Sequence, residues 1–176
     1  MARGTPGAPA RSLKARAIQW LAQREHSRAE LRRKLLPHAL AEVAAEGTET
    51  ADAAHARLDA LLDWLEAQHH LSQQRFVESR VHARASRFGN LRIRQELAQH
   101  QLGLPADVES TLRDTELDRA RAVWALRFSG RPTDAAERGR QARFLAGRGF
   151  SGDVIHRVLR ESGATTAGAT AALDTD

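Results

Sequence analysis

Arginine is the residue type whose clustering in this sequence suggests a chemistry, because guanidinium groups bind phosphates and carboxylates. The densest group recurs at helical spacing and continues past a turn: Arg80, Arg84, Arg87, Arg92 and Arg94. Two further groups flank other expected helices: Arg28, Arg32 and Arg33, then Arg138, Arg140, Arg143 and Arg148. We predict that these groups contact an acidic protein surface or DNA. The alternative is a solvated helix face, with the middle group paired with Glu78 or Glu96.

The sequence contains no residue pattern typical of metal binding, nucleotide binding or catalysis. Cysteine is absent, which excludes disulfides, zinc ribbons and thiol catalysis. Eight histidines are present, but the adjacent pair His69 and His70 points in different directions on a helix, and no His-Glu-x-x-His spacing occurs. No phosphate-binding glycine loop, nucleophile elbow or apolar carboxylate pair is found. The sequence therefore predicts a non-enzymatic protein with no metal or cofactor.

Composition favours a folded helical protein with a basic surface. The 176 residues are 41% hydrophobic and carry a formal net charge of +5. Charge is uneven, with seven acidic residues and one basic residue over 42–68, but ten basic and three acidic residues over 119–160. No apolar stretch approaches the roughly 20 residues of a membrane span, and residues 1–10 do not form a secretory signal. We expect a cytoplasmic protein that does not enter a membrane.

Helical spacing of apolar residues predicts about nine short helices and no strand. The first covers Leu13–Glu25. The second begins at Arg28, after the capping box Ser27–Glu30, and is expected to end at Pro37. The segment Ala39–Ala51 that follows is interpreted as a helix extension plus a loop. A third contains Ala54–Leu65. A fourth is capped by Ser72 and stopped by Gly89, and a fifth is capped by Asn90 and closed by Gly103.

Four more helices are expected in the remaining sequence. The sixth begins at Pro105 and carries Val108 and Leu112, and a separate seventh covers Leu117–Phe128. The eighth follows the capping sequence Asp134–Glu137, and the ninth, capped by Ser151 or Asp153, covers Val154–Leu159. Three tryptophans lie on the apolar stripes, where core packing is their expected role: Trp20, Trp64 and Trp124.

The middle helices of three consecutive helix triplets can be aligned. Leu31–Leu35 matches Ile93–Leu97, and Gln141–Leu145 fits more loosely. This pattern predicts an all-α fold of three tandem three-helix repeats, elongated and curved. The expected boundaries are 11–70 with an acidic insertion, 71–115 and 116–162, between tails at 1–10 and 163–176.

Three runs of this sequence resemble the RecX family. The first is Ala17–Leu35, with its Arg-Glu-x-Ser step and following Glu-Leu-x-x-Lys-Leu helix. The second includes Leu71, Arg75-Phe76, Arg87-Phe88-Gly89 and Ile93–Leu97. The third is Phe144–Phe150, followed by Val154, Ile155 and Val158. The likeness spans Leu13–Leu159. It departs from the family pattern at the acidic insertion, at Leu36–Ala39 and at Phe76-Val77.

The resemblance implies a regulator that binds the RecA–single-stranded DNA filament and lodges along its helical groove. Such a regulator either blocks filament growth or promotes disassembly. We expect the protein to be a monomer. It also implies inhibition of the recombinase, ATPase and coprotease activities, and so modulation of DNA repair and the SOS response. On this basis, reversing Arg84 and Arg94 to Glu should weaken filament binding without loss of helix. The alternative function is a direct DNA-binding module of the helix-turn-helix or nucleoid type, acting on single- or double-stranded DNA.

Overall fold

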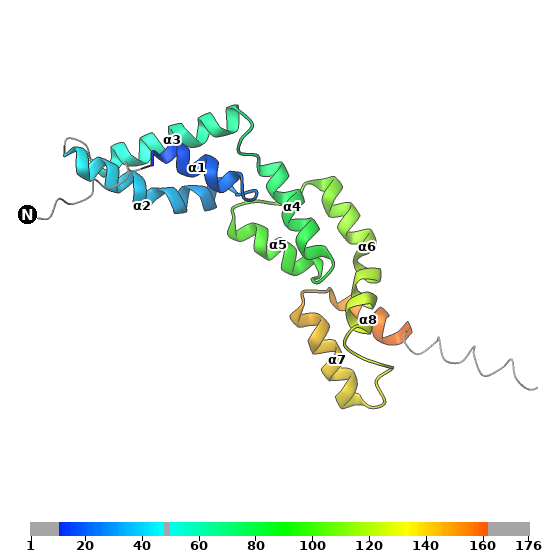
Figure 1. Ribbon diagram of the computed structural model, residues 1–176. Coiled ribbons are helices and arrows are strands. Elements are labelled where there is room, and N and C mark those ends of the chain that lie inside the picture. The colour runs from blue at the N-terminus through cyan, green and yellow to red at the C-terminus, as the bar shows by residue number, and fades with distance from the viewer. Residues whose placement is uncertain (1–10, 48–49, 162–176) are drawn as a thin grey trace, which may run out of the picture. The chain divides into compact units, whose positions relative to one another are not determined.

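The computed structural model describes residues 11–47 and 50–161, and every regular element in these ranges is an α-helix (Figure 1). The predicted all-α class is confirmed. The two predicted tails, 1–10 and 163–176, lie outside the described residues. The helices are α1 (Leu13–Leu21), α2 (Arg28–Glu46), α3 (Ala51–Ala67), α4 (Gln73–Ala85), α5 (Asn90–Gln99), α6 (Ala106–Ala125), α7 (Ala135–Gly147) and α8 (Gly152–Glu161).

The chain divides into two compact units, and the first, up to Phe76, is built on α1, α2 and α3. Buried apolar side chains recur at the three- or four-residue spacing of one helix face on α2, so one stripe faces α3. The buried residues of α3 follow the same spacing, and Leu13 and Ala17 of α1 complete the core. The members of α2 and α3 are Leu31, Leu35, Ala39, Val43, Ala54, Leu58, Leu62 and Leu65.

The beginning of α2 follows the predicted cap. Ser27 Oγ accepts a hydrogen bond of 3.1 Å from the Glu30 amide, so α2 begins at Arg28 as expected. The predicted end at Pro37 is wrong, because the helix continues through this residue to Glu46. The buried stripe passes from Leu35 to Ala39 across the proline, and its packing outweighs the local cost of Pro37.

Pro37→Ala should therefore raise the free energy of unfolding by about 1–3 kcal/mol. Proline removes one intrahelical hydrogen bond and crowds the preceding turn, whereas alanine does neither. The exposed position of Pro37 means that little packing is lost. Urea unfolding followed by circular dichroism measures the change, with Pro105→Ala as the control, because Pro105 precedes the first turn of α6. A less stable Pro37→Ala protein would show that the proline itself contributes to packing.

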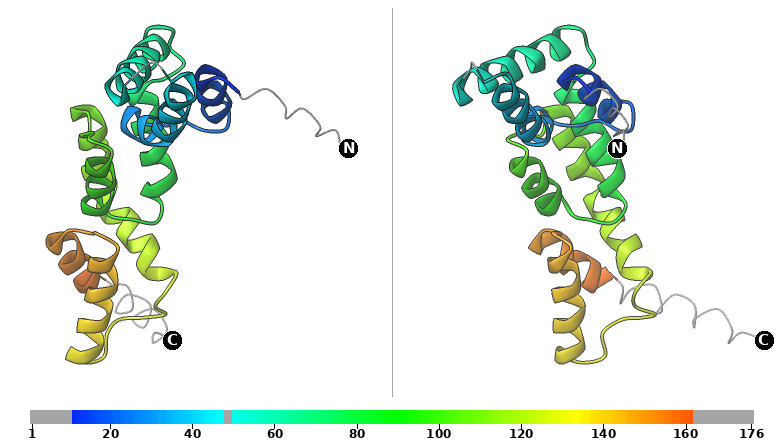
Figure 2. Two further views of the ribbon diagram at one scale, coloured as in Figure 1. Left: turned by 90° about the vertical axis from the view of Figure 1, so that its left-hand side faces the viewer. Right: turned by 60° about the vertical axis from the view of Figure 1, so that its left-hand side comes forward.

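The second unit, from Val77, centres on α6. The predicted separate sixth and seventh helices are wrong, because Ala106–Ala125 is one helix. No proline or glycine interrupts this segment, and its buried side chains Leu112, Glu116, Ala120 and Val123 form one continuous stripe. The first half of α6 packs beside α5, and α7 and α8 pack with α6 around a second core, as Figure 2 also shows.

Two predicted turn features of α5 are also corrected. Gly89 is the cap residue of α5, and Asn90 is its first helical residue rather than its cap. At the other end, Gln101 has a left-handed φ of 61°, the conformation that the sequence pattern predicts for Gly103. Ser72 and Asp134 cap as predicted, since their side chains accept from the amides of Arg75 and Glu137.

The positions aligned as a repeat share one environment. Leu31 and Leu35 of α2, Ile93 and Leu97 of α5, and Gln141 and Leu145 of α7 are all buried. The three aligned helices therefore use the matched residues in the same way. The repeat boundaries themselves stay a prediction.

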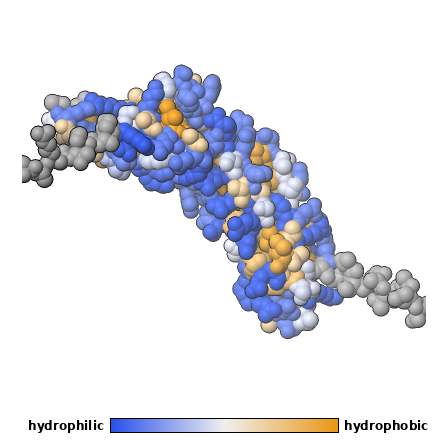
Figure 3. Space-filling view, in the orientation of Figure 1, coloured by the Kyte–Doolittle hydropathy of each residue, from blue (hydrophilic) through white to orange (hydrophobic). Residues whose placement is uncertain are grey.

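The face drawn in Figure 3 is mainly polar. It carries hydrophobic patches over the α1–α3 region and over the region where α6, α7 and α8 meet. No helix within 11–47 or 50–161 combines the length and the apolar character needed to cross a membrane.

Candidate protein and nucleic-acid interface

The first predicted arginine group is largely engaged in ion pairs between α2 and α3. Arg28 donates to Asp63 at 2.6 Å and to Glu66 at 2.8 Å. Arg32 pairs with Asp59 at 2.9 Å, and this pairing holds the pKa of the Asp59 carboxyl below its usual value. Three of the acidic residues of 42–68, all on α3, thus face the arginines of α2. Arg33 is exposed, and no acidic partner is found for it among the described residues.

The middle group is also partly paired, as the alternative interpretation anticipated for Glu96. Arg84 lies 2.9 Å from a Glu96 oxygen and Arg80 lies 3.5 Å from the other, so one carboxylate of α5 serves both arginines of α4. Arg94 is paired with Glu109 of α6. Reversing Arg84 or Arg94 to Glu would therefore place like charges together at Glu96 or Glu109, as well as change the charge of the surface.

Three arginines, two from the middle group and one from the third, surround Phe88. The guanidinium carbons of Arg84, Arg87 and Arg148 lie 5.7, 5.9 and 5.8 Å from the centre of its ring. Arg148 also donates to the carbonyl of Arg87 at 3.3 Å. These distances allow cation–π attraction, which holds the positive groups close together. We call Arg84, Arg87, Arg148 and Phe88 the Phe88 cluster.

The Phe88 cluster is held by a backbone junction between two turns. The Gly89 amide donates to the Arg148 carbonyl at 3.0 Å, and the Leu91 amide donates to the Gly149 carbonyl at 3.1 Å. The contact leaves no room for a side chain, since a Cβ on Gly89 would lie 2.3 Å from the Gly149 oxygen. The backbone and Cβ of Arg92 lie beside Gly149 at the same junction, and the Arg92 residue is exposed. The structure thus brings part of the middle group together with Arg148 of the third.

The rest of the third group is more open. Arg140 pairs with Glu137 one turn earlier on α7 at 3.1 Å, and 66% of its side chain is exposed. Arg143 and Arg138 are exposed as well. Exposed pairs of this kind contribute little stability, so Arg140 can exchange Glu137 for another anion at small cost.

A buried polar network beneath the junction was not predicted. Glu116 is 5% exposed and accepts from the Asn90 amide at 2.9 Å. Arg119, one turn further along α6, donates to the carbonyls of Ala85 and Phe88 at 3.0 and 2.8 Å. Its burial lowers the pKa of its guanidinium, although Glu116 opposes that shift. The available signal was Glu116 itself, a charged residue on the apolar stripe between Leu112 and Ala120.

The core roles predicted for the tryptophans are confirmed. Trp20 and Trp64 pack on the core of the first unit, and Trp124 packs on the second core. The Trp124 indole also donates to Gln141 at 2.8 Å. Within the described ranges, no group of three acidic or histidine side chains could hold a metal ion.

Comparison with known proteins decides the family. A protein of Ralstonia nicotianae named "Regulatory protein RecX" is 50% identical over 151 residues, which are 85% of this chain and 87% of that protein. A protein of the same name from Leptothrix cholodnii is 51% identical over 156 residues, 86% of this chain and 90% of that protein. The chain belongs to the RecX family.

Two further comparisons agree with this membership. A family profile described as "RecX, third three-helix domain" matches residues 114–159. The crystal structure of RecX from Lactobacillus salivarius matches with a TM-score of 0.60, covering 86% of this chain and 95% of that one at 17% identity. The resemblance found from the motifs is therefore confirmed, and the relatives are named as regulatory proteins.

The RecX motifs fall on residues that shape the fold and on residues that remain at the surface. Gly89 and Gly149 come from two different motif runs and meet at the backbone junction. Phe150, which follows Gly149, is buried in the second core. Arg87 and Arg148 lie beside these structural residues, so the junction fixes their positions on the surface.

One histidine of the first RecX motif is buried beside a carboxylate. His26 is 1% exposed, and its Nδ1 atom lies 3.2 Å from a Glu30 oxygen without the alignment of a hydrogen bond. Burial lowers the pKa of the His26 imidazole below its usual value near 6.5, and the attraction of Glu30 opposes this shift only in part. The folded protein therefore holds His26 neutral at neutral pH.

Stability should fall as the pH drops below about 6.5. The unfolded chain then takes up a proton at His26 that the folded chain does not bind, which favours unfolding by up to about 1.4 kcal/mol per pH unit. The loss continues until the pH reaches the lowered pKa of the folded protein. Urea unfolding at a series of pH values should show that the free energy of unfolding depends less on pH in His26→Gln than in the wild type. His156→Gln, at an exposed site, is the control and should keep the wild-type slope.

Proposed function

We propose that this protein binds the RecA–single-stranded DNA filament and inhibits its recombinase, ATPase and coprotease activities. Through these effects it would modulate DNA repair and the SOS response. Membership of the RecX family carries this proposal, since its relatives are named as regulatory proteins. The proposal also includes that the protein is a cytoplasmic monomer and has no enzymatic activity of its own.

Arg87 and Arg92, on the two sides of the backbone junction beside Phe88, form the contact surface that we favour. Arg87 and Arg92 are exposed, and neither has an acidic partner in the part of the chain that the structure describes. Their cations are therefore available to an anionic surface without first breaking an ion pair. The arginines paired with Glu96, Glu109 and the acids of α3 are less available, because a partner would have to displace those carboxylates.

The test is DNA-dependent ATP hydrolysis by RecA, measured at increasing concentrations of this protein. Inhibition at less than one molecule per RecA protomer, unchanged when more single-stranded DNA is supplied, is the expected result. A direct DNA-binding module would instead inhibit only by occupying the DNA, and added DNA would then restore hydrolysis. That outcome would favour the alternative function.

Arg87→Glu combined with Arg92→Glu should raise the concentration for half-inhibition about tenfold, because two attractive contacts become repulsive. The matched control is Arg113→Glu combined with Arg157→Glu, which makes the same change of charge at two other exposed sites. Circular dichroism should show unchanged helix content in both proteins. Equal inhibition by the two variants would remove Arg87 and Arg92 from the contact surface.

A further inference from the structure

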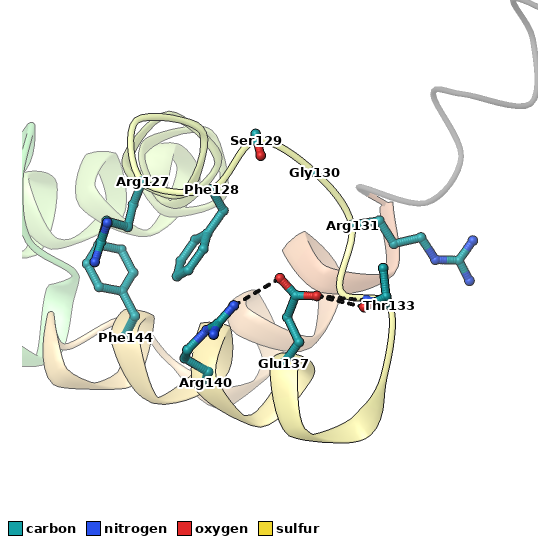
Figure 4. A pocket seen from close by; sticks show the side chains of 9 residues that line it. All are labelled: Arg127, Phe128, Ser129, Gly130, Arg131, Thr133, Glu137, Arg140 and Phe144. Carbon is teal, nitrogen blue, oxygen red and sulfur yellow. Dashed lines mark hydrogen bonds and ion pairs between the residues drawn. The ribbon is translucent and has the colours of Figure 1, made fainter.

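A cleft lies between the end of α6, the connection 126–134 and α7 (Figure 4). Its volume is about 630 Å³, within the roughly 300–1,000 Å³ typical of ligand sites. We call it the α6–α7 cleft. Its wall combines two phenylalanines with three arginines: Phe128, Phe144, Arg127, Arg131 and Arg140.

The two aromatic rings are engaged with each other and with a cation. Phe128 and Phe144 meet edge to face, with ring centres 5.3 Å apart and planes at 89°. The guanidinium carbon of Arg148 lies 5.0 Å from the centre of the Phe144 ring. A nucleic-acid base needs an open, flat ring face on which to stack. The two rings instead meet at a right angle, and the concave apolar surface between them suits an apolar side chain better than a flat base.

The acidic residue of the α6–α7 cleft, Glu137, already accepts hydrogen bonds from neighbouring residues. Glu137 accepts from the amide and the hydroxyl of Thr133 at 3.1 and 2.9 Å, and from Arg140 at 3.1 Å. The hydrogen bonds from Thr133 lower the pKa of the Glu137 carboxyl. Arg127 and Arg131 have no acidic partner among the residues that the structure describes, and both are exposed. The cleft therefore has a surplus of positive charge.

The positive charge continues beyond the cleft. A second hollow of about 330 Å³ shares Arg131 and Thr133 with it and adds Arg138 and Arg160. Its one acidic residue, Asp134, already accepts a hydrogen bond from the Glu137 amide. Figure 4 shows Arg131 extending away from the two rings. Two adjoining hollows with arginines along both suit an extended anionic chain rather than a small molecule.

We propose that the α6–α7 cleft binds an extended acidic segment of a protein. An apolar side chain of the segment packs against the two phenylalanines, and its carboxylates pair with the arginines of the two hollows. Arginine binds carboxylates through two parallel hydrogen bonds, which gives such a contact direction as well as charge. This inference does not depend on the identity of the filament proposed above.

The experiment measures fluorescence anisotropy with the full chain and two labelled probes. One probe is a short peptide of alternating Asp, Glu and Leu residues, and the other is oligothymidylate. The test variant is Arg127→Glu with Arg140→Glu. Its matched control is Arg113→Glu with Arg157→Glu, at exposed sites that line neither hollow. A second peptide, with Ser in place of Leu, tests the apolar contact.

We expect the test variant to bind the acidic peptide at least about tenfold more weakly than the control, and the Ser peptide to bind several-fold more weakly than the Leu peptide. Oligothymidylate should not distinguish the test variant from the control. The proposal is overturned if the wild type does not bind the peptide or if both variants bind it equally. It is also overturned if the test variant loses as much affinity for oligothymidylate as for the peptide. ATPase inhibition by the wild type is scored separately, so failure of either proposal leaves the other testable.

Discussion

Gly89→Ala should lower the free energy of unfolding by about 2–3 kcal/mol or more, because its methyl group has no space to occupy. A Cβ at this position would lie 2.3 Å from both the Gly149 oxygen and the Phe150 nitrogen. These are backbone atoms held by the hydrogen bonds of the junction, so the turns must separate to relieve the overlap. Gly149→Ala should act similarly, since Gly149 has a φ of 83° and a Cβ there would lie 2.5 Å from the Arg92 Cβ.

The measurement is urea unfolding followed by circular dichroism, with Gly103→Ala as the matched control. A Cβ added to Gly103 would meet no atom within 4 Å, so the same change of side chain should be nearly neutral there. If Gly89→Ala were as stable as Gly103→Ala, the two turns would not be in contact in solution. The positions assigned to Arg87 and Arg148 would then lose their support.

Arg119→Met should lower the free energy of unfolding by about 2–4 kcal/mol, because it removes donors to part-buried carbonyls and the cation near the buried Glu116 carboxylate. Arg119 supplies hydrogen bonds to the carbonyls of Ala85, Phe88 and Leu112, and it lies near the buried Glu116 carboxylate. Methionine preserves much of the side-chain length but none of the donors or the charge. Removing one partner from a buried polar group costs more than the original bond contributed.

Arg121→Met is the matched control for this prediction. It changes the same residue type two positions along α6, where the side chain forms exposed ion pairs with Asp118 and Glu161. Surface pairs of this kind contribute about 0–1 kcal/mol, so the expected loss is small. Equal unfolding curves for the two variants would contradict the structural role assigned to the buried network.

Features governed by neighbouring residues were predictable from the sequence, and those governed by tertiary contacts were not. Ser27 and Asp134 cap their helices because each side chain reaches an amide three residues later. Pro37 misled the prediction because packing on α3 holds α2 together across it. The unbroken α6 could have been inferred, because no breaker separates Leu112 from Leu117.

The features of the candidate site were likewise predictable where neighbouring residues govern them and unpredictable where tertiary contacts do. Helical spacing placed the arginines on shared faces, but it could not show that Arg28 and Arg32 meet acids on α3. Nor could it place Arg148 beside Phe88, since the two residues are 60 positions apart and meet only through the glycine junction. The sequence therefore indicates the type of surface, whereas the structure separates its paired arginines from Arg87 and Arg92.

Co-sedimentation with preformed RecA filaments tests the central claim most directly. RecA-coated single-stranded DNA and the same DNA without RecA are each mixed with this protein at physiological salt and pelleted. We predict that the protein pellets with the coated DNA at concentrations where bare DNA retains little of it. Equal retention on coated and bare DNA, or none on the filament, would contradict a function as a regulator of RecA.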